Sequence, residues 1–124
     1  MTSTLLTGLY IWDGERPQPG DAILVHGERI AAVGSSDELS ADTVIDCSGL
    51  TALPGLIDAH VHMELNPEDR SPPRPTDVSD AAMARMRERA VAMLGAGITT
   101  APDLGGGAWL ALALRAEINA RKVR

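Results

Sequence analysis

The sequence is poor in cysteine and in aromatic residues, and it has no long apolar run. Its 124 residues include one cysteine, Cys47, two tryptophans, one tyrosine and no phenylalanine. A single cysteine cannot form a disulfide within the chain, so nothing indicates an oxidising compartment. No segment approaches the roughly 18 apolar residues of a membrane span, and the first residues lack the basic and apolar regions of a signal peptide. We therefore expect a cytoplasmic protein with no membrane partner and a core of aliphatic side chains and methionine.

Positive charge is also scarce. Lysine and arginine together number 11 against 17 aspartates and glutamates, which gives a formal net charge of −6. Proteins that bind nucleic acids need a basic patch or stripe to neutralise phosphates, and the sequence has none. We therefore exclude nucleic acid as a partner.

The most informative stretch is residues 53–62, which read Leu-Pro-Gly-Leu-Ile-Asp-Ala-His-Val-His. A Pro-Gly breaker precedes a short apolar run, as is typical of a buried strand. Residues two apart on a strand share one face and lie about 6.6 Å apart, so His60 and His62 should project together. Two imidazoles at that separation can bind one divalent ion through Zn–N bonds of roughly 2.0–2.1 Å. Asp58 has the same parity and is expected on the same face.

The pattern of apolar residues changes at Pro54, and this predicts two domains, 1–54 and 55–124. The first should be the N-terminal part of a small β-sandwich, because short strands alternate with turn signals. Its expected strands lie at residues 5–12, 22–26, 29–33, 43–46 and 51–53, and the second and third of them should form a hairpin across Gly27-Glu28.

The second domain should alternate strands and helices. Residues 55–62 and 98–102 are the expected strands, each followed by a stretch with helical spacing of apolar residues. A complete (β/α)₈ barrel needs about 250 residues, whereas residues 55–124 make up only 70. The prediction is therefore an α/β protein that comprises the first two of the eight β/α units of a TIM-like barrel, behind an unfinished sandwich.

Two segments resemble a known family. Pro54-Gly55-Leu56-Ile57-Asp58-Ala59-His60-Val61-His62 looks like the metal-binding signature of the amidohydrolase superfamily. Gly97-Ile98-Thr99-Thr100, followed by Asp103-Leu104-Gly105-Gly106, is similar to the second-strand motif of its imidazolonepropionase-like and Xaa-Pro dipeptidase-like members. The resemblance extends from about Leu5 to the last residue.

The resemblance implies a function and a cofactor. His60 and His62 would bind a divalent metal, usually zinc, as one or two ions in a complete protein. The remaining ligands in the family come from later strands, namely a lysine, two histidines and an aspartate. The implied reaction is hydrolysis of an amide or other C–N bond by a metal-activated water. The substrate would be a small amide-type molecule, such as a cyclic imide-like compound, an acyl amino acid or a dipeptide.

Three acidic residues near these motifs have alternative interpretations. Asp58 is either a hydrogen-bond acceptor that orients a ligand histidine or a buried, hydrogen-bonded strand residue. Asp103 either faces the active site or caps the following helix, and the cap is favoured. The Val-Arg that often precedes this aspartate in the family is replaced by Ala101-Pro102. Glu64 is expected to be a solvated loop charge rather than a substrate contact.

The function also has an alternative. The chain would be either the N-terminal part of a metal-dependent amidohydrolase or a catalytically incomplete fragment. A non-enzymatic homologue that acts as a structural or complementing chain belongs to the second class. The expected partners are the remaining barrel segment, a complementing chain or a second copy in a homo-oligomer. Metal ligands beyond His60 and His62 would distinguish these alternatives.

Overall fold

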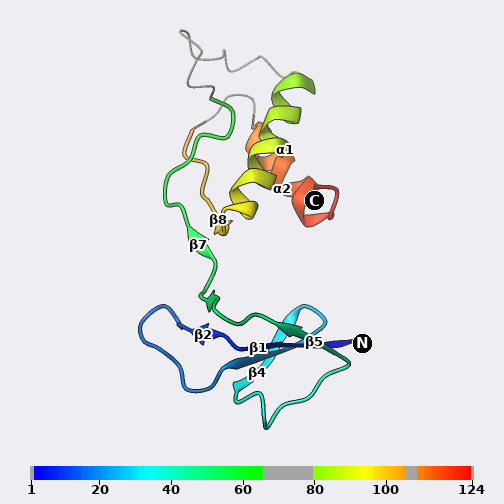
Figure 1. Ribbon diagram of the computed structural model, residues 1–124. Coiled ribbons are helices and arrows are strands. Elements are labelled where there is room, and N and C mark those ends of the chain that lie inside the picture. Colours follow the sequence, from blue (N-terminus) through cyan, green and yellow to red (C-terminus); the bar gives the residue numbers. More distant parts are fainter. Residues whose placement is uncertain (1, 66–79, 106–108, 124) are drawn as a thin grey trace. The chain divides into compact units, whose positions relative to one another are not determined.

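The computed structural model describes residues 2–65, 80–105 and 109–123. The chain divides into two compact units, Met1–Pro54 and Gly55–Arg124 (Figure 1). Each unit has its own cluster of buried apolar side chains.

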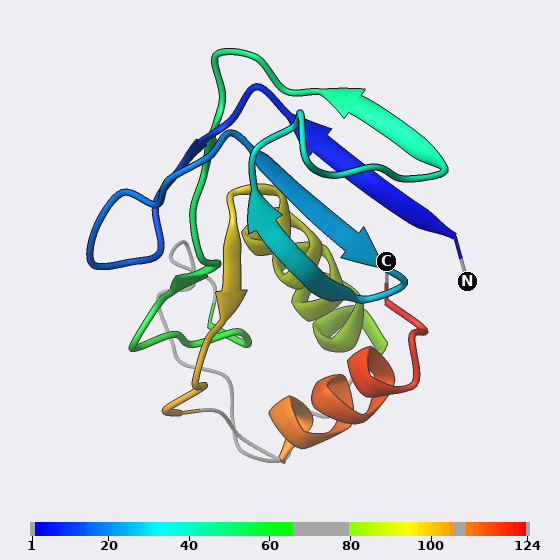
Figure 2. The ribbon, with the colours of Figure 1, turned by 90° about the horizontal axis from the view of Figure 1, so that it is seen from below.

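The first unit consists of two small sheets. Its strands are β1 (Ser3–Thr7), β2 (Tyr10–Ile11), β3 (Ala22–His26), β4 (Arg29–Gly34), β5 (Thr43–Asp46) and β6 (Thr51–Ala52). Four of them form a sheet in the order β4-β3-β1-β5, seen side by side in Figure 2, and β2 pairs with β6. The predicted hairpin is confirmed, because β3 and β4 are antiparallel with His26 opposite Arg29.

The strand expected at residues 5–12 is interrupted, so that prediction is wrong in its extent. Gly8 has a φ of 73°, and a Cβ at this position would collide with Ser48. The chain therefore turns between β1 and β2, and Leu9 points inward. Leu9, Ile11 and Ile23 pack together as a buried cluster, and Leu5 and Ala22 of the same unit are also buried.

The second unit contains two strands and two helices in alternation. They are β7 (Leu56–Ile57), α1 (Asp80–Gly95), β8 (Ile98–Thr100) and α2 (Leu110–Asn119). β7 and β8 are parallel, with Leu56 opposite Ile98. The shared core is made of Met63, Ala82, Met83, Met86, Leu110 and Leu114. Methionine is flexible enough to fill the irregular space between helices that lack large aromatic residues.

A partly buried ion pair joins the two helices. Arg87 on α1 donates from Nε and Nη2 to the two carboxylate oxygens of Glu117 on α2, at 2.6 and 2.7 Å. The pKa of the Glu117 carboxyl is lowered, chiefly by these hydrogen bonds from Arg87.

The strand expected at residues 55–62 is much shorter in the structure. The ladder shifts register between Leu56 and Ile57, and β7 ends there. The chain then bends and pairs again only at Val61, which is opposite Asp103. His60 and His62 therefore do not lie on a regular strand, and the alternation of strand faces does not explain how they meet.

Helix length and composition bear on membrane association. Among the helices that the structure describes, none is both long enough and apolar enough to cross a membrane.

Candidate metal site

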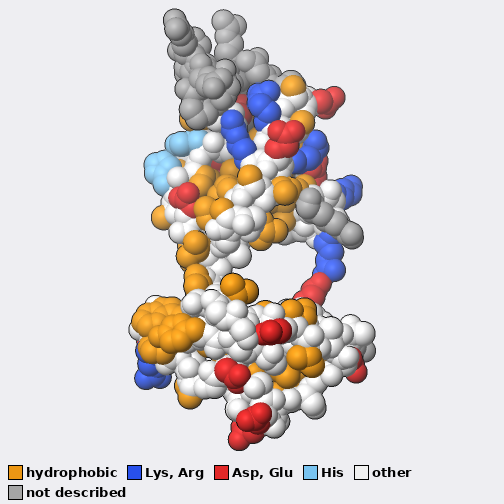
Figure 3. All heavy atoms as spheres, in the orientation of Figure 1, with side chains coloured by type: hydrophobic (Ala, Val, Ile, Leu, Met, Phe, Trp, Pro, Cys, Tyr) orange, Lys and Arg blue, Asp and Glu red, His pale blue; other side chains and the backbone are white. Residues whose placement is uncertain are grey.

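The structure brings the two histidines of the Pro-Gly segment together at the surface of the second unit. The Nε2 atoms of His60 and His62 are 3.0 Å apart. The ring centroids are separated by 4.9 Å, and the ring planes are inclined at 66°. Figure 3 shows histidine side chains adjacent to one another on this surface. Both rings are exposed to solvent, so an ion can reach them directly.

The His62 ring is held from its other side. Its Nδ1 lies 3.0 Å from the carbonyl oxygen of Gly105. A carbonyl oxygen only accepts hydrogen bonds, so this contact assigns a proton to Nδ1. In the neutral form of the ring, Nε2 is then the nitrogen with a free lone pair. Metal-binding histidines commonly have such a carbonyl or carboxylate on the second nitrogen. The contact therefore prepares His62 to bind a metal through Nε2.

Asp58 acts on the backbone of His60. Its Oδ1 accepts a hydrogen bond from the His60 amide at 3.1 Å, and its own amide donates to the carbonyl of Thr100. The carboxylate thus stabilises the bend after β7. The ring of His62 is hydrogen-bonded to the Gly105 carbonyl and not to Asp58. The sequence interpretation did not identify Gly105.

Asp103 does not cap the following helix, so the favoured interpretation of this residue is wrong. The residue before α2 is Trp109, with a φ of 59° and no side-chain capping bond. Instead, Asp103 accepts hydrogen bonds from the amides of Met63 at 3.3 Å and of Gly105 at 3.1 Å. The carboxylate thus joins the backbone after Val61 to the backbone after Asp103, directly beside His62.

Glu64 is buried, with a fractional exposure of 4%, so the expectation of a solvated loop charge is wrong. The chain after His62 turns inward here, because Met63 enters the core between the helices. Arg89 on α1 donates to the Met63 carbonyl oxygen at 2.5 Å. The segment that follows the histidines is thereby fixed to α1, a contact that no local sequence signal indicates.

The donor set fits part of a metal centre. Two nitrogen ligands about 2.0–2.1 Å from one zinc ion lie about 3.3 Å apart at a tetrahedral angle. The observed 3.0 Å between the Nε2 atoms differs from this by a few tenths of an ångström. Across residues 2–65, 80–105 and 109–123, no group of three or more histidine, cysteine, aspartate or glutamate side chains is placed to hold an ion. His60 and His62 would supply two ligands of such a centre, whereas zinc sites in enzymes use at least three from protein.

Comparison with known proteins gives a consistent family match. The family model described as "Amidohydrolase family" matches residues 51–121, which is more than half of the chain. This region contains both histidines, Asp58 and Asp103.

Two curated relatives match shorter segments. D-aminoacylase of Alcaligenes xylosoxydans xylosoxydans is 44% identical over 59 residues, which cover 47% of this chain and 12% of the relative. The 5-methylthioadenosine/S-adenosylhomocysteine deaminase of Syntrophobacter fumaroxidans is 46% identical over 54 residues, or 40% of this chain and 12% of the relative. The matched segments thus span about an eighth of these proteins.

A solved structure matches nearly the whole chain. The crystal structure of an amidohydrolase aligns with 99% of this chain and 30% of its own, at 26% identity and a TM-score of 0.74. The α/β architecture described above is therefore that of about three tenths of this larger protein.

Proposed function

The chain belongs to the amidohydrolase family, and from this premise we propose that it forms the N-terminal part of a metal-dependent hydrolase of C–N bonds. The family comprises hydrolases that act on C–N bonds, and they are generally metal-dependent. In the proposal, His60 and His62 are two of the metal ligands, and zinc is the metal, as one or two ions. The remaining ligands belong to the rest of a complete protein.

The observation that carries the proposal is the approach of the two imidazoles. Their Nε2 atoms are 3.0 Å apart, and Nδ1 of His62 is hydrogen-bonded to the Gly105 carbonyl. A bound divalent ion would lower the pKa of a coordinated water to about 7 and polarise a substrate carbonyl. This chain's own contribution is to hold two imidazole nitrogens side by side in an exposed position.

We propose that the two units are the beginnings of a β-sandwich and of a TIM-like barrel. The parallel pair β7 and β8 with the intervening helix α1 supports the barrel, because parallel neighbours need such a crossover. The histidines follow β7 toward its C-terminal end, which is the side of a barrel where active sites lie. The two sheets of the first unit support the sandwich.

The proposed substrate is a small amide-type molecule. The relatives named above are an aminoacylase and a deaminase, and both names describe the breaking of a bond between carbon and nitrogen. Substrate specificity in barrel enzymes depends on loops from all units. We therefore propose only the class of bond that is broken, a C–N bond, and no particular compound.

The test uses the complete gene product. Removal of metal with a chelator should abolish the release of amine or ammonia from a panel of acyl amino acids, cyclic imides and aminopurines, and zinc should restore it. His60→Ala and His62→Ala should each lower kcat/KM by at least about a thousandfold, comparable to the loss of a member of a catalytic constellation. His26→Ala, in the other unit, is the matched control and should retain activity. Full activity in the chelated protein or in either histidine variant would contradict the proposal.

A further inference from the structure

We propose that Asp103 is a positioning residue for His62. Its carboxylate holds the Gly105 carbonyl against the imidazole and thereby sets which ring nitrogen is available to a metal. The inference rests on the proposed function in that it assigns a role toward the same ion.

The first step is the backbone pairing around Val61. The Val61 amide donates to the Pro102 carbonyl at 3.2 Å, and the Leu104 amide donates to the Val61 carbonyl at 3.1 Å. Val61 is thus hydrogen-bonded through its backbone to the residues on either side of Asp103. This pairing places His62 next to Gly105, although 43 positions separate them in the sequence.

The second step is the way the Asp103 carboxylate uses its two oxygens. Oδ2 accepts from the amide of Met63, the residue after His62, and Oδ1 accepts from the amide of Gly105. One side chain therefore fixes both the backbone that carries the imidazole and the residue whose carbonyl orients it. The contacts are partly buried, which reduces competition from water.

The third step is the absence of a side chain at Gly105. A Cβ there would lie 2.9 Å from Cε1 and 3.0 Å from Nδ1 of His62. Any larger residue would push the ring or the carbonyl away, because these separations are well inside ordinary contact. Glycine is therefore required for the hydrogen bond from Nδ1 to the carbonyl, and Asp103 keeps that glycine in place.

Asp103 differs in this respect from Asp58, whose hydrogen bond reaches the His60 backbone only two residues away. A merely structural role for Asp103 would be to join the strand ends. A positioning role also sets the protonation site of His62, and this is measurable without any metal.

The test is the tautomer of His62 in the metal-free full chain. Two-bond ¹H–¹⁵N correlation spectra, recorded above the ordinary histidine pKa of about 6.5, report which ring nitrogen carries the proton. We expect Nδ1 in the wild type. In Asp103→Ala the proton should move toward Nε2, and in Asp103→Asn, whose amide oxygen can still accept from Gly105, it should stay on Nδ1. His26, in the other unit, is the internal control and should not change.

Zinc affinity provides the second readout. Loss of such an orienting partner typically weakens metal binding by roughly 10–100-fold, so Asp103→Ala should raise the Kd for zinc at least about tenfold. Gly105→Ala should also shift the tautomer of His62, because its Cβ would displace the ring or the carbonyl. This variant provides the test if Asp103→Ala does not fold. A His62 proton that stays on Nδ1 in folded Asp103→Ala or in Gly105→Ala would overturn the inference. Failure of the wild type to bind zinc would contradict the proposed function alone, since the tautomer is measured without metal.

Discussion

At the residue scale, the two histidines are held by different means. His62 is fixed through its ring by the Gly105 carbonyl, whereas His60 is fixed through its backbone amide by Asp58. The His62 ring is thus pre-oriented, whereas the orientation of the His60 ring depends on the bend after β7. Pre-orientation of ligands reduces the entropy lost when an ion binds.

A glycine directly before β7 gives the first prediction. A Cβ at Gly55 would overlap Oγ1, Cγ2 and Cβ of Thr99, which is β-branched and cannot rotate away from the contact. Gly55→Ala should therefore destabilise the second unit by roughly 1–3 kcal/mol, the usual cost of overpacking. The measurement is urea denaturation followed by circular dichroism.

Gly95→Ala is the matched control. Nothing lies within 4 Å of a Cβ at that position, which is the last residue of α1. The substitution should be neutral or stabilise the protein by up to about 1 kcal/mol, because alanine favours helix. Equal denaturation midpoints for the two variants would show that Gly55 and Thr99 are not in close contact.

The proximity of His60 and His62 was predictable from sequence, but their surroundings were not. The spacing of His60 and His62 after a Pro-Gly breaker indicates a shared site. Asp103 contacts Met63, and Gly105 contacts His62, and in both cases the partners are 40 or more residues apart along the chain. Local patterns carry no information on such pairing, and so the cap interpretation of Asp103 was wrong.

At the element scale, helices were more predictable than strands. The methionines of α1 recur with helical spacing; in the structure Met83 and Met86 are buried and Met93 is partly buried. Strand lengths depend on pairing partners, which sequence periodicity does not identify. The strands expected at 5–12 and 55–62 are both interrupted, by a left-handed glycine in the first case and by a register shift in the second.

The ion pair between α1 and α2 gives the second prediction. Arg87→Ala and Glu117→Ala should each lower the thermal midpoint modestly, and the double variant should lose less than the sum, because the two side chains bind one another. The effect should shrink with added salt, since exposed ion pairs are screened. Glu88→Ala on the exposed side of α1 is the control. A strictly additive double variant would contradict the coupling.

Carboxylates at strand ends in the first unit give the third prediction. Asp42 accepts from the amide and hydroxyl of Ser3 at 2.7 and 2.8 Å, and these hydrogen bonds lower the pKa of its carboxyl below the ordinary 3.8. The pKa values of three more carboxyls are lowered in the same way, each mainly by nearby hydrogen bonds: Asp13, Asp21 and Asp46.

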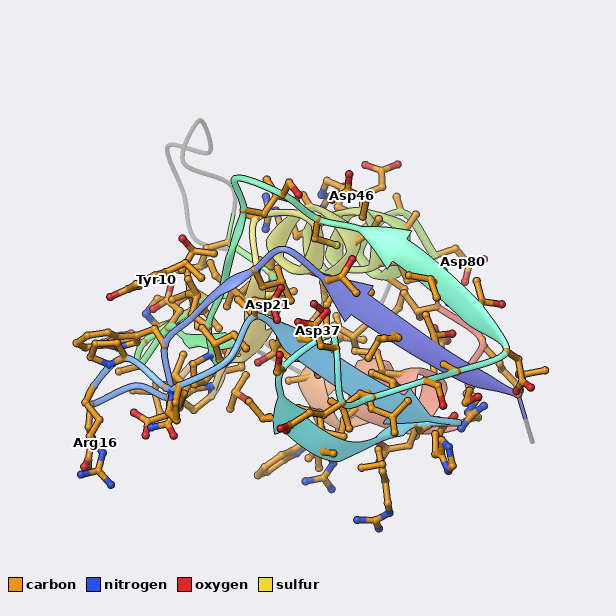
Figure 4. All side chains as sticks on the ribbon, turned by 60° about the horizontal axis from the view of Figure 1, so that its bottom comes forward. Tyr10, Arg16, Asp21, Asp37, Asp46 and Asp80 are labelled. Carbon is orange, nitrogen blue, oxygen red and sulfur yellow. The ribbon has the colours of Figure 1, made fainter. Side chains whose placement is uncertain are left out.

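A lowered pKa in the folded state means that the unfolded chain takes up protons first as the pH falls. The contribution of these groups to stability is therefore complete above a pH of about 3.8 and is lost as the pH falls through the lower folded values. Asp42→Asn should make the stability of the first unit less dependent on pH in this range. The exposed Asp37, labelled with Asp21 and Asp46 in Figure 4, provides the control Asp37→Asn. An unchanged acid dependence in Asp42→Asn would contradict the assignment.

At the scale of the whole molecule, much apolar surface is uncovered in both units. In the first unit the exposed large side chains include Ile30, Val33, Val44 and Ile45, and in the second they include Leu56, Ile57, Leu94, Leu104 and Leu112. Exposed apolar side chains mark interaction surfaces where they form a contiguous patch. β4 and β5 are moreover the edges of their sheet and offer backbone groups to other strands.

The fourth prediction is that the 124-residue chain associates with itself. Light scattering during size-exclusion chromatography should give a mass above the monomer that rises with concentration. Val44→Lys on the edge strand β5 should reduce the association, because charges on an edge strand oppose edge-to-edge pairing. Thr43→Lys on the same edge strand should reduce the association for the same reason. A monodisperse monomer at all concentrations would contradict the prediction.

Zinc titration of the metal-free chain by isothermal calorimetry tests the central claim most directly, that His60 and His62 bind one divalent ion together. The prediction is saturable binding of one zinc ion per chain, lost in the His60→Ala, His62→Ala double variant and retained in His26→Ala. Zinc binding of equal affinity and stoichiometry in the wild type and the double variant would contradict it.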